Sequence, residues 1–281
     1  MSDYNLRRVT RRLSVHFVAF WIGTAIAAAD ARADDKVPIP PPQPNLVQQA
    51  NAPIATVFQV RLQDSYAPKF DGTDGTGNTF TVAVTMPLPA YRLLPFPQLS
   101  VLTLPAAVKL PGGPGGFGDV RFLDIAMLDV GHRVLFGIGP TLVFPTASSE
   151  VTGQGKWQAG PAAAIAFAPK DWLVGLIAQN PISFAGSGKR RNADALFLQP
   201  FATVQFGEGW FVRSQPQLTF DWKSHKQFLP LDLGFGRVFK IEEQSLSCFV
   251  EMYRNLSTDE PAPRYGVILG VSLLYPNIWR R

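Results

Sequence analysis

The feature that most constrains the fold is a long stretch of period-two alternation in the second half of the chain. In WFVRSQPQLTFDW (210–222), alternate positions form a mostly apolar face that begins at Trp210 and ends at Trp222, and the positions between them are mostly polar. Successive side chains of a strand point to opposite sides. A strand in a soluble protein averages about five or six residues, whereas a tilted strand needs about 9–11 residues to cross a bilayer. The pattern predicts a long strand with one face toward an apolar medium.

Similar segments recur along the chain, and the residues GEG (207–209) form a tight turn between two of them. We expect about twelve strands, near 54–63, 79–88, 98–109, 118–129, 132–145, 157–168, 171–184, 194–206, 210–222, 228–239, 245–255 and 264–275. Prolines at 140, 161, 181, 200 and 216 fall within these segments and cannot donate a ladder hydrogen bond, so we expect each to form a local bulge.

The connections between these segments alternate between short and long. Short links such as 207–209 and 240–244 alternate with longer ones such as 63–78, 145–156 and 185–193. Outer-membrane barrels have short periplasmic turns, longer extracellular loops and an even strand number. The sequence therefore predicts an all-β protein, a transmembrane antiparallel up-and-down β-barrel of about twelve strands. A soluble sandwich is the alternative.

The N-terminus has the pattern of an export signal. Four arginines precede an apolar run from Leu13 to about Ala29, and Ala31-Arg32-Ala33 supplies a signal-peptidase site. We expect a signal peptide over 1–33 with cleavage after Ala33, a Pro-rich periplasmic linker over 34–53, and a barrel over 54–281. An uncleaved membrane anchor is the alternative for the first segment.

Charge and cysteine content exclude several classes of function. Residues 1–33 carry five arginines and two aspartates, so the rest of the chain has a net charge of only +2, which does not indicate nucleic-acid binding. Charged residues make up 17% of the chain, against about 25% in ordinary soluble domains. Cys248 is the only cysteine, and it lies in an apolar pattern typical of packing.

The strand alternation also assigns side chains to the inside and the outside of the expected barrel. Polar residues predicted to line the lumen are Arg213, Gln215, Gln217, Asp221, Asp232, Glu251, Tyr253 and Asn255. Four phenylalanines, Phe197, Phe201, Phe211 and Phe249, share that inner face, where they either border an apolar path or fill space. On the outer face, Trp210, Trp222, Tyr265 and Tyr275 are predicted to lie at the two lipid interfaces.

Several motifs in order resemble a known family. The runs 137–167, 182–222 and 234–246, with GFGD at 116–119, resemble the bacterial outer-membrane β-barrel family described as "MetA-pathway of phenol degradation" proteins or transporters, often labelled neuromedin U. The resemblance covers roughly 110–275. It implies a barrel and uptake of small hydrophobic or aromatic compounds, and it supplies no catalytic residues.

The remaining chemistry leaves two alternatives to a channel. A closed barrel with a structural or adhesive role would also fit, and its loop cations 189–191, 223 and 225–226 could bind the phosphates of lipopolysaccharide. An outer-membrane lipase would need a serine–histidine arrangement built around His132. No histidine pair has metal-ligand spacing and no phosphate-binding motif occurs, so we expect no catalytic, metal or cofactor site.

Overall fold

The computed structural model describes residues 46–51, 57–90, 95–130, 134–169, 171–257, 259 and 261–275. The expected signal peptide, its cleavage site, most of the expected linker, His132 and the C-terminal residues 276–281 lie outside this range.

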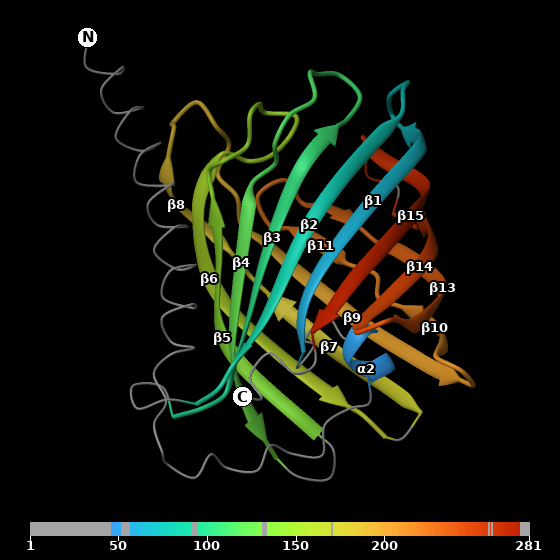
Figure 1. Ribbon diagram of the computed structural model, residues 1–281. Helices are drawn as coiled ribbons and strands as arrows, with labels where there is room; N and C mark the ends of the chain where they lie inside the picture. Colours follow the sequence, from blue (N-terminus) through green and yellow to red (C-terminus); the bar gives the residue numbers. More distant parts are fainter. Residues whose placement is uncertain are drawn as a thin grey trace. The chain divides into compact units, whose positions relative to one another are not determined.

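The described residues form one short helix and fifteen strand segments joined in a single antiparallel sheet (Figure 1). The helix is α2 (Leu46–Asn51), and the strands are β1 (Phe58–Asp71), β2 (Gly77–Leu88), β3 (Gln98–Lys109), β4 (Val120–Asp129), β5 (Val134–Phe144), β6 (Lys156–Phe167), β7 (Trp172–Gln179), β8 (Ile182–Gly186), β9 (Ala195–Phe206), β10 (Trp210–Ser214), β11 (Leu218–Asp221), β12 (Lys226–Phe228), β13 (Pro230–Ile241), β14 (Gln244–Asn255) and β15 (Ala262–Tyr275).

The sheet closes on itself. The last strand, β15, pairs with β1 along its whole length, and β9 pairs with β10, so the ladder runs round the wall. Three pairs of segments continue one another along the chain, namely β7 with β8, β10 with β11, and β12 with β13. The result is the predicted closed barrel of twelve antiparallel strands.

Two of the five prolines expected to form bulges divide their own strand, and three lie within a continuous strand. Pro181 separates β7 from β8, and Pro216 separates β10 from β11. In contrast, Pro140 pairs with Pro161, and Pro200 pairs with Leu176, without a shift in register. The prediction of bulges at these three positions was wrong, because no extra residue is inserted and the register continues. Each proline instead lies at a gap in the ladder with its other neighbouring strand, where a proline has no N–H to donate.

The first strand is longer than expected. We predicted a loop over 63–78, but β1 continues to Asp71 and β2 begins at Gly77. The polar positions Gln63 and Ser65 suggested a loop, whereas they belong to an inner face that is polar. A polar inner face removes the contrast by which the end of a strand is usually recognised.

Part of the expected extended linker is also folded differently. Residues Leu46–Asn51 are helical, and the side chains from Gln48 to Asn51 are buried. Helix α2 contacts β9, β10 and β13. Its Ala50 belongs to an apolar cluster with Leu173, Phe201 and Phe211, so this end of the barrel interior is filled.

Candidate functional site

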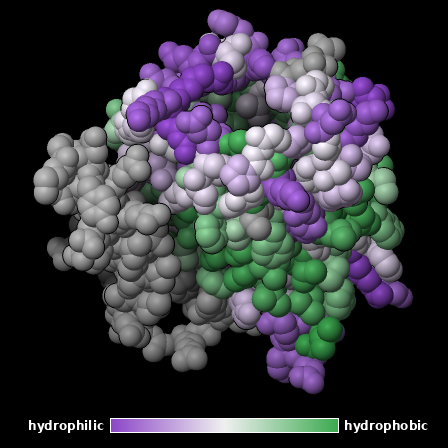
Figure 2. Space-filling model, turned by 90° about the horizontal axis from the view of Figure 1, so that it is seen from above, coloured by the Kyte–Doolittle hydropathy of each residue, from purple (hydrophilic) through white to green (hydrophobic). Residues whose placement is uncertain are grey.

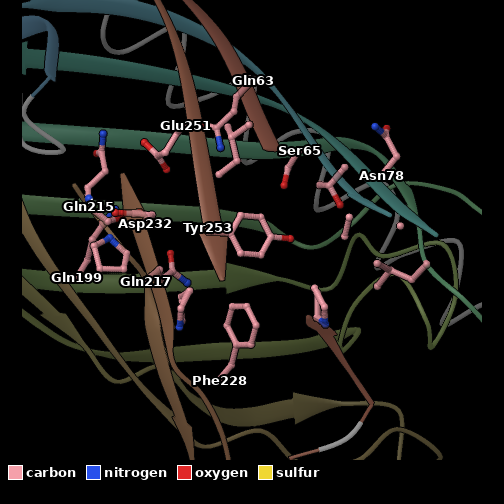
Figure 3. Close-up of a pocket in the computed structure, with 18 of the residues that line it drawn as sticks. Gln63, Ser65, Asn78, Gln199, Gln215, Gln217, Phe228, Asp232, Glu251 and Tyr253 are labelled. Carbon is pink, nitrogen blue, oxygen red and sulfur yellow. Dashed lines mark hydrogen bonds between the residues drawn. The ribbon is translucent and has the colours of Figure 1, made fainter. Parts of the chain in front are cut away.

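A cavity of about 330 Å³ lies within the barrel and is the candidate functional site. Its walls come from strands far apart in the sequence, including β1, β9, β10, β13 and β14. Figure 3 shows the rings of Tyr253 and Phe228 and the amides of Gln199, Gln215 and Gln217 around this space. Its volume is near the lower end of the range for small-molecule pockets, about 300–1,000 Å³.

A buried ion pair lies at one end of the cavity. Arg213 Nε donates to Glu251 Oε2 over 3.0 Å, and both side chains are almost fully buried. The Arg213 guanidinium carbon lies 3.4 Å from the centroid of the Phe249 ring. Turning the Gln215 amide so that its oxygen faces Arg213 adds acceptor contacts of 2.9 Å. A guanidinium donates in several fixed directions, and here different partners satisfy those directions.

Helix α2 supplies two further acceptors at the same end. Arg213 donates to the Asn51 side-chain oxygen over 3.3 Å, and Arg61 donates to the Ala50 carbonyl oxygen over 3.2 Å. The Gln48 amide donates to the Pro169 and Trp172 carbonyl oxygens at the β6–β7 turn. Arg213 and Glu251 line the cavity and form its floor, and α2 is bound to Arg213 and Arg61 by these hydrogen bonds.

The structure brings most of the predicted inner residues to this site. Arg213, Gln215, Gln217, Asp232, Glu251 and Tyr253 all line the cavity. Asp221 does not: it accepts from Arg191 over 2.8 Å at the end of β11. Asn255 is buried and accepts from the backbone N–H of Leu229. Of the inner phenylalanines, Phe201, Phe211 and Phe249 are buried, and the Phe197 ring lies under Arg121 at 4.9 Å.

Residues of β1 were missed by the sequence analysis. Arg61, Gln63 and Ser65 line the cavity and alternate at period two along the strand. The same alternation that identified β10 was present here. It was not recognised because the segment was divided between a predicted strand and a predicted loop.

The outside of the barrel is apolar. Figure 2 shows hydrophobic residues gathered in one broad area of the visible face, with hydrophilic residues above and below it. Of the four predicted interface aromatics, Trp222, Tyr265 and Tyr275 are exposed. Trp210 is half-buried and stacks on Phe235 with ring centroids 4.9 Å apart. Such rings suit a membrane–water interface, so their placement there is a proposal that the exposure supports.

The loop cations are partly neutralised. Arg191 pairs with Asp221, and Arg190 lies 3.8 Å from Glu150 while donating to the Gly153 carbonyl oxygen. These contacts reduce the positive charge that the loops offer to a phosphate group. Binding of lipopolysaccharide by the loops stays a prediction.

The described residues contain no group of three His, Cys, Asp or Glu side chains that could hold a metal ion. Cys248 is a free, half-buried thiol. No helix within the described ranges has the length and apolar character needed to span a membrane.

Comparison with known proteins identifies the fold. No protein-family model and no curated protein matches the sequence. Among solved structures, the chain is similar to the COG4313 outer membrane channel from Pseudomonas putida F1, with a TM-score of 0.57 and 14% identity over 88% of this chain and 100% of that one. It is also similar to the NanC porin, with a TM-score of 0.52 and 9% identity over 78% of this chain and 98% of that one. The chain has the barrel fold of these proteins.

An enzyme also occurs among the similar barrels. The outer membrane phospholipase A from Escherichia coli matches with a TM-score of 0.43 and 10% identity over 81% of this chain and 95% of that one. The resemblance of 110–275 to the phenol-degradation family stays a prediction, because no family model matches.

Proposed function

We propose that this chain is an outer-membrane channel for small hydrophobic or aromatic compounds, exported by a signal peptide that is cleaved after Ala33. The observation that carries the proposal is a closed twelve-stranded barrel with an apolar outer wall and an internal cavity lined by both amides and aromatic rings. A solute held there could stack on Tyr253 or Phe228 and hydrogen-bond to the glutamine amides.

Flux measurements test the channel directly. Purified protein is reconstituted into liposomes, and permeation of small sugars and of small aromatic alcohols is compared with protein-free liposomes. The proposal predicts faster permeation of the aromatic solutes. Equal rates with and without protein, for protein shown to be folded, would reject it.

A closed barrel with a structural or adhesive role is the second candidate. Helix α2 and the Arg213–Glu251 pair favour it, because both occupy the interior. It predicts no solute flux from either side in the same experiment. The lipase alternative depends on His132, which lies outside the described residues, and it predicts lipid hydrolysis that is lost in His132→Ala.

A further inference from the structure

Arg121 is a cation of the barrel interior that lacks an acidic partner. It lies on the inner face of β4, because the inner residues Leu123 and Ile125 follow it at period two. Its side chain is exposed to solvent even though the barrel wall surrounds it, so it lies in a water-accessible part of the lumen. In the described part of the chain, no ion pair joins its guanidinium to an acidic side chain, in contrast to Arg213 with Glu251.

Two acidic side chains at this end of the barrel are already bound to other groups. Asp119 accepts from the Ala147 N–H over 3.0 Å with one carboxylate oxygen and from the Gly155 N–H over 2.9 Å with the other. Asp221 pairs with Arg191 over 2.8 Å. A guanidinium has five N–H donors and no acceptor. The free cation of β4 therefore keeps donors that a ligand can use.

Arg121 contacts an aromatic residue on a distant strand. Its guanidinium carbon lies 4.9 Å from the centroid of the Phe197 ring in β9, and because β4 and β9 are not neighbours in the sheet, this contact crosses the interior. Phe197 is opposite Thr219, and Thr219 is opposite Phe228, so these three residues form one row across β9, β11 and β12. Neighbouring strands are about 4.8 Å apart, which places Phe197 roughly 10 Å from Phe228. Since Phe228 lines the cavity, the cation lies beside the cavity.

Lys156 is a second cation on the same part of the inner wall. Arg121 is opposite Val143 and Val143 is opposite Gln158, and Lys156 shares the inner face with Gln158 two residues away. Lys156 is only 6% exposed, and within the described ranges its ammonium group forms no ion pair or hydrogen bond. Lysine is almost never fully buried without a partner. The two cations together make this part of the lumen positive, which favours an anion there.

A carboxylate attached to an aromatic ring matches this arrangement. Its two oxygens accept parallel N–H bonds from a guanidinium, which a single hydroxyl group cannot do. The rings of Phe228 and Tyr253 border the adjacent cavity, where a ligand ring can stack (Figure 3). We infer that the solute of the cavity is a small aromatic carboxylate, with its carboxylate on Arg121 and its ring toward Phe228 and Tyr253. This inference rests on the proposed channel function and names its solute class.

Ligand binding to the purified full-length protein in detergent tests the site without requiring conduction. Heats of binding are measured at about pH 7, where a carboxylic acid is ionised. The probes are benzoate, benzyl alcohol, which keeps the ring without the charge, and acetate, which keeps the charge without the ring. The parent protein should bind benzoate at least about tenfold more tightly than either of the others, because only benzoate uses both the guanidinium and the aromatic wall.

Substitutions of Arg121 identify the group that binds the carboxylate. Arg121→Gln should weaken benzoate binding at least about tenfold and leave benzyl alcohol binding unchanged, because only the charged bonds are lost. Arg121→Lys keeps the charge but not the planar fork of donors, and its affinity should be intermediate. Arg237→Gln is the matched control, since that guanidinium also lies over a ring, 5.0 Å from the Trp210 centroid, but on the outer face of β13 with the exposed Phe235. It should bind benzoate like the parent, and a gel shift on boiling verifies that each variant is folded.

Failure of this inference is distinguishable from failure of the channel. Benzoate binding that is absent in the parent, or unchanged in Arg121→Gln, would reject the carboxylate site, while permeation of benzyl alcohol into liposomes would still support the channel. Equal affinities for benzoate and acetate would reject an aromatic solute. If benzoate binds but no aromatic compound enters liposomes that contain folded protein, benzoate is a ligand and not a transported solute, and both the proposed function and this inference are overturned.

Discussion

At the scale of single residues, the cavity floor depends on one buried ion pair with a full set of partners. Arg213 is held by Glu251, Asn51 and the Phe249 ring. Gly270 is part of this arrangement, because a Cβ at that position would clash with the Phe249 ring. The close approach of the ring to the wall leaves room for the guanidinium above it.

Removal of one partner should therefore destabilise the barrel. Glu251→Ala leaves a buried guanidinium without its carboxylate, and such a loss typically costs about 3–5 kcal/mol. We expect a lower thermal unfolding midpoint in detergent, followed by the loss of β-sheet circular dichroism. Channel conductance should change as well, because the floor loses its central contact.

Glu208→Ala is the matched control for this substitution. Its carboxylate pairs with Arg237 over 3.4 Å, and that pair is solvent-exposed. Exposed pairs contribute about 0–1 kcal/mol, so the midpoint should hardly move. Equal decreases of the unfolding midpoint for the two substitutions would show that the stability of the barrel does not depend on the pairing of Arg213 with Glu251.

The sequence predicted which polar residues face inward but not which of them meet. Period-two alternation placed Arg213, Asp232 and Glu251 on the inner face, and they do line the cavity. Contacts such as Arg213 with Asn51 join positions separated by 162 residues. No local pattern carries that information, because it depends on the closure of the barrel.

At the scale of elements, α2, which is hydrogen-bonded to the cavity residues Arg61 and Arg213, is the part that the sequence did not reveal. Its six residues are too few to show a helical period and follow a Pro-rich run, so an extended linker was the natural expectation. Contacts with the barrel interior, rather than helix propensity, stabilise this helix. Gln48 and Asn51 hydrogen-bond to the barrel through their side chains.

Loosening α2 should open the axial path. In the double variant Gln48→Ala, Asn51→Ala the helix loses its side-chain contacts with the β6–β7 turn and with Arg213. We expect a several-fold rise in single-channel conductance in planar bilayers, since ions would pass where the helix lay. Gln227→Ala, at an exposed position in β12, should leave conductance unchanged. An unaltered conductance in the double variant would show that α2 does not close the interior.

At the scale of the whole molecule, closure is the property that makes a membrane location physically acceptable. Strands β15 and β1 pair from Tyr275 with Phe58 to Ala262 with Asp71, so no sheet edge is left open at the junction of the first and last strands. Unpaired backbone groups are costly in hydrocarbon, and a closed barrel removes them. The even strand number also brings both ends of the sheet to the side of the short turns, as the alternation of loop lengths predicted.

Closure leads to a prediction for the intact protein. A closed barrel resists dodecyl sulfate until it is heated, because the ladder must open cooperatively around the whole circumference. Outer-membrane fractions should therefore contain a fast-migrating form that shifts to the expected mass on boiling. A variant that ends before Ala262 lacks β15, leaves one edge of β1 and one edge of β14 unpaired, and should show no shift. Full-length protein recovered from the soluble periplasm, with no shift on boiling, would mean that the apolar outer wall does not face lipid, and the proposed channel function would be rejected.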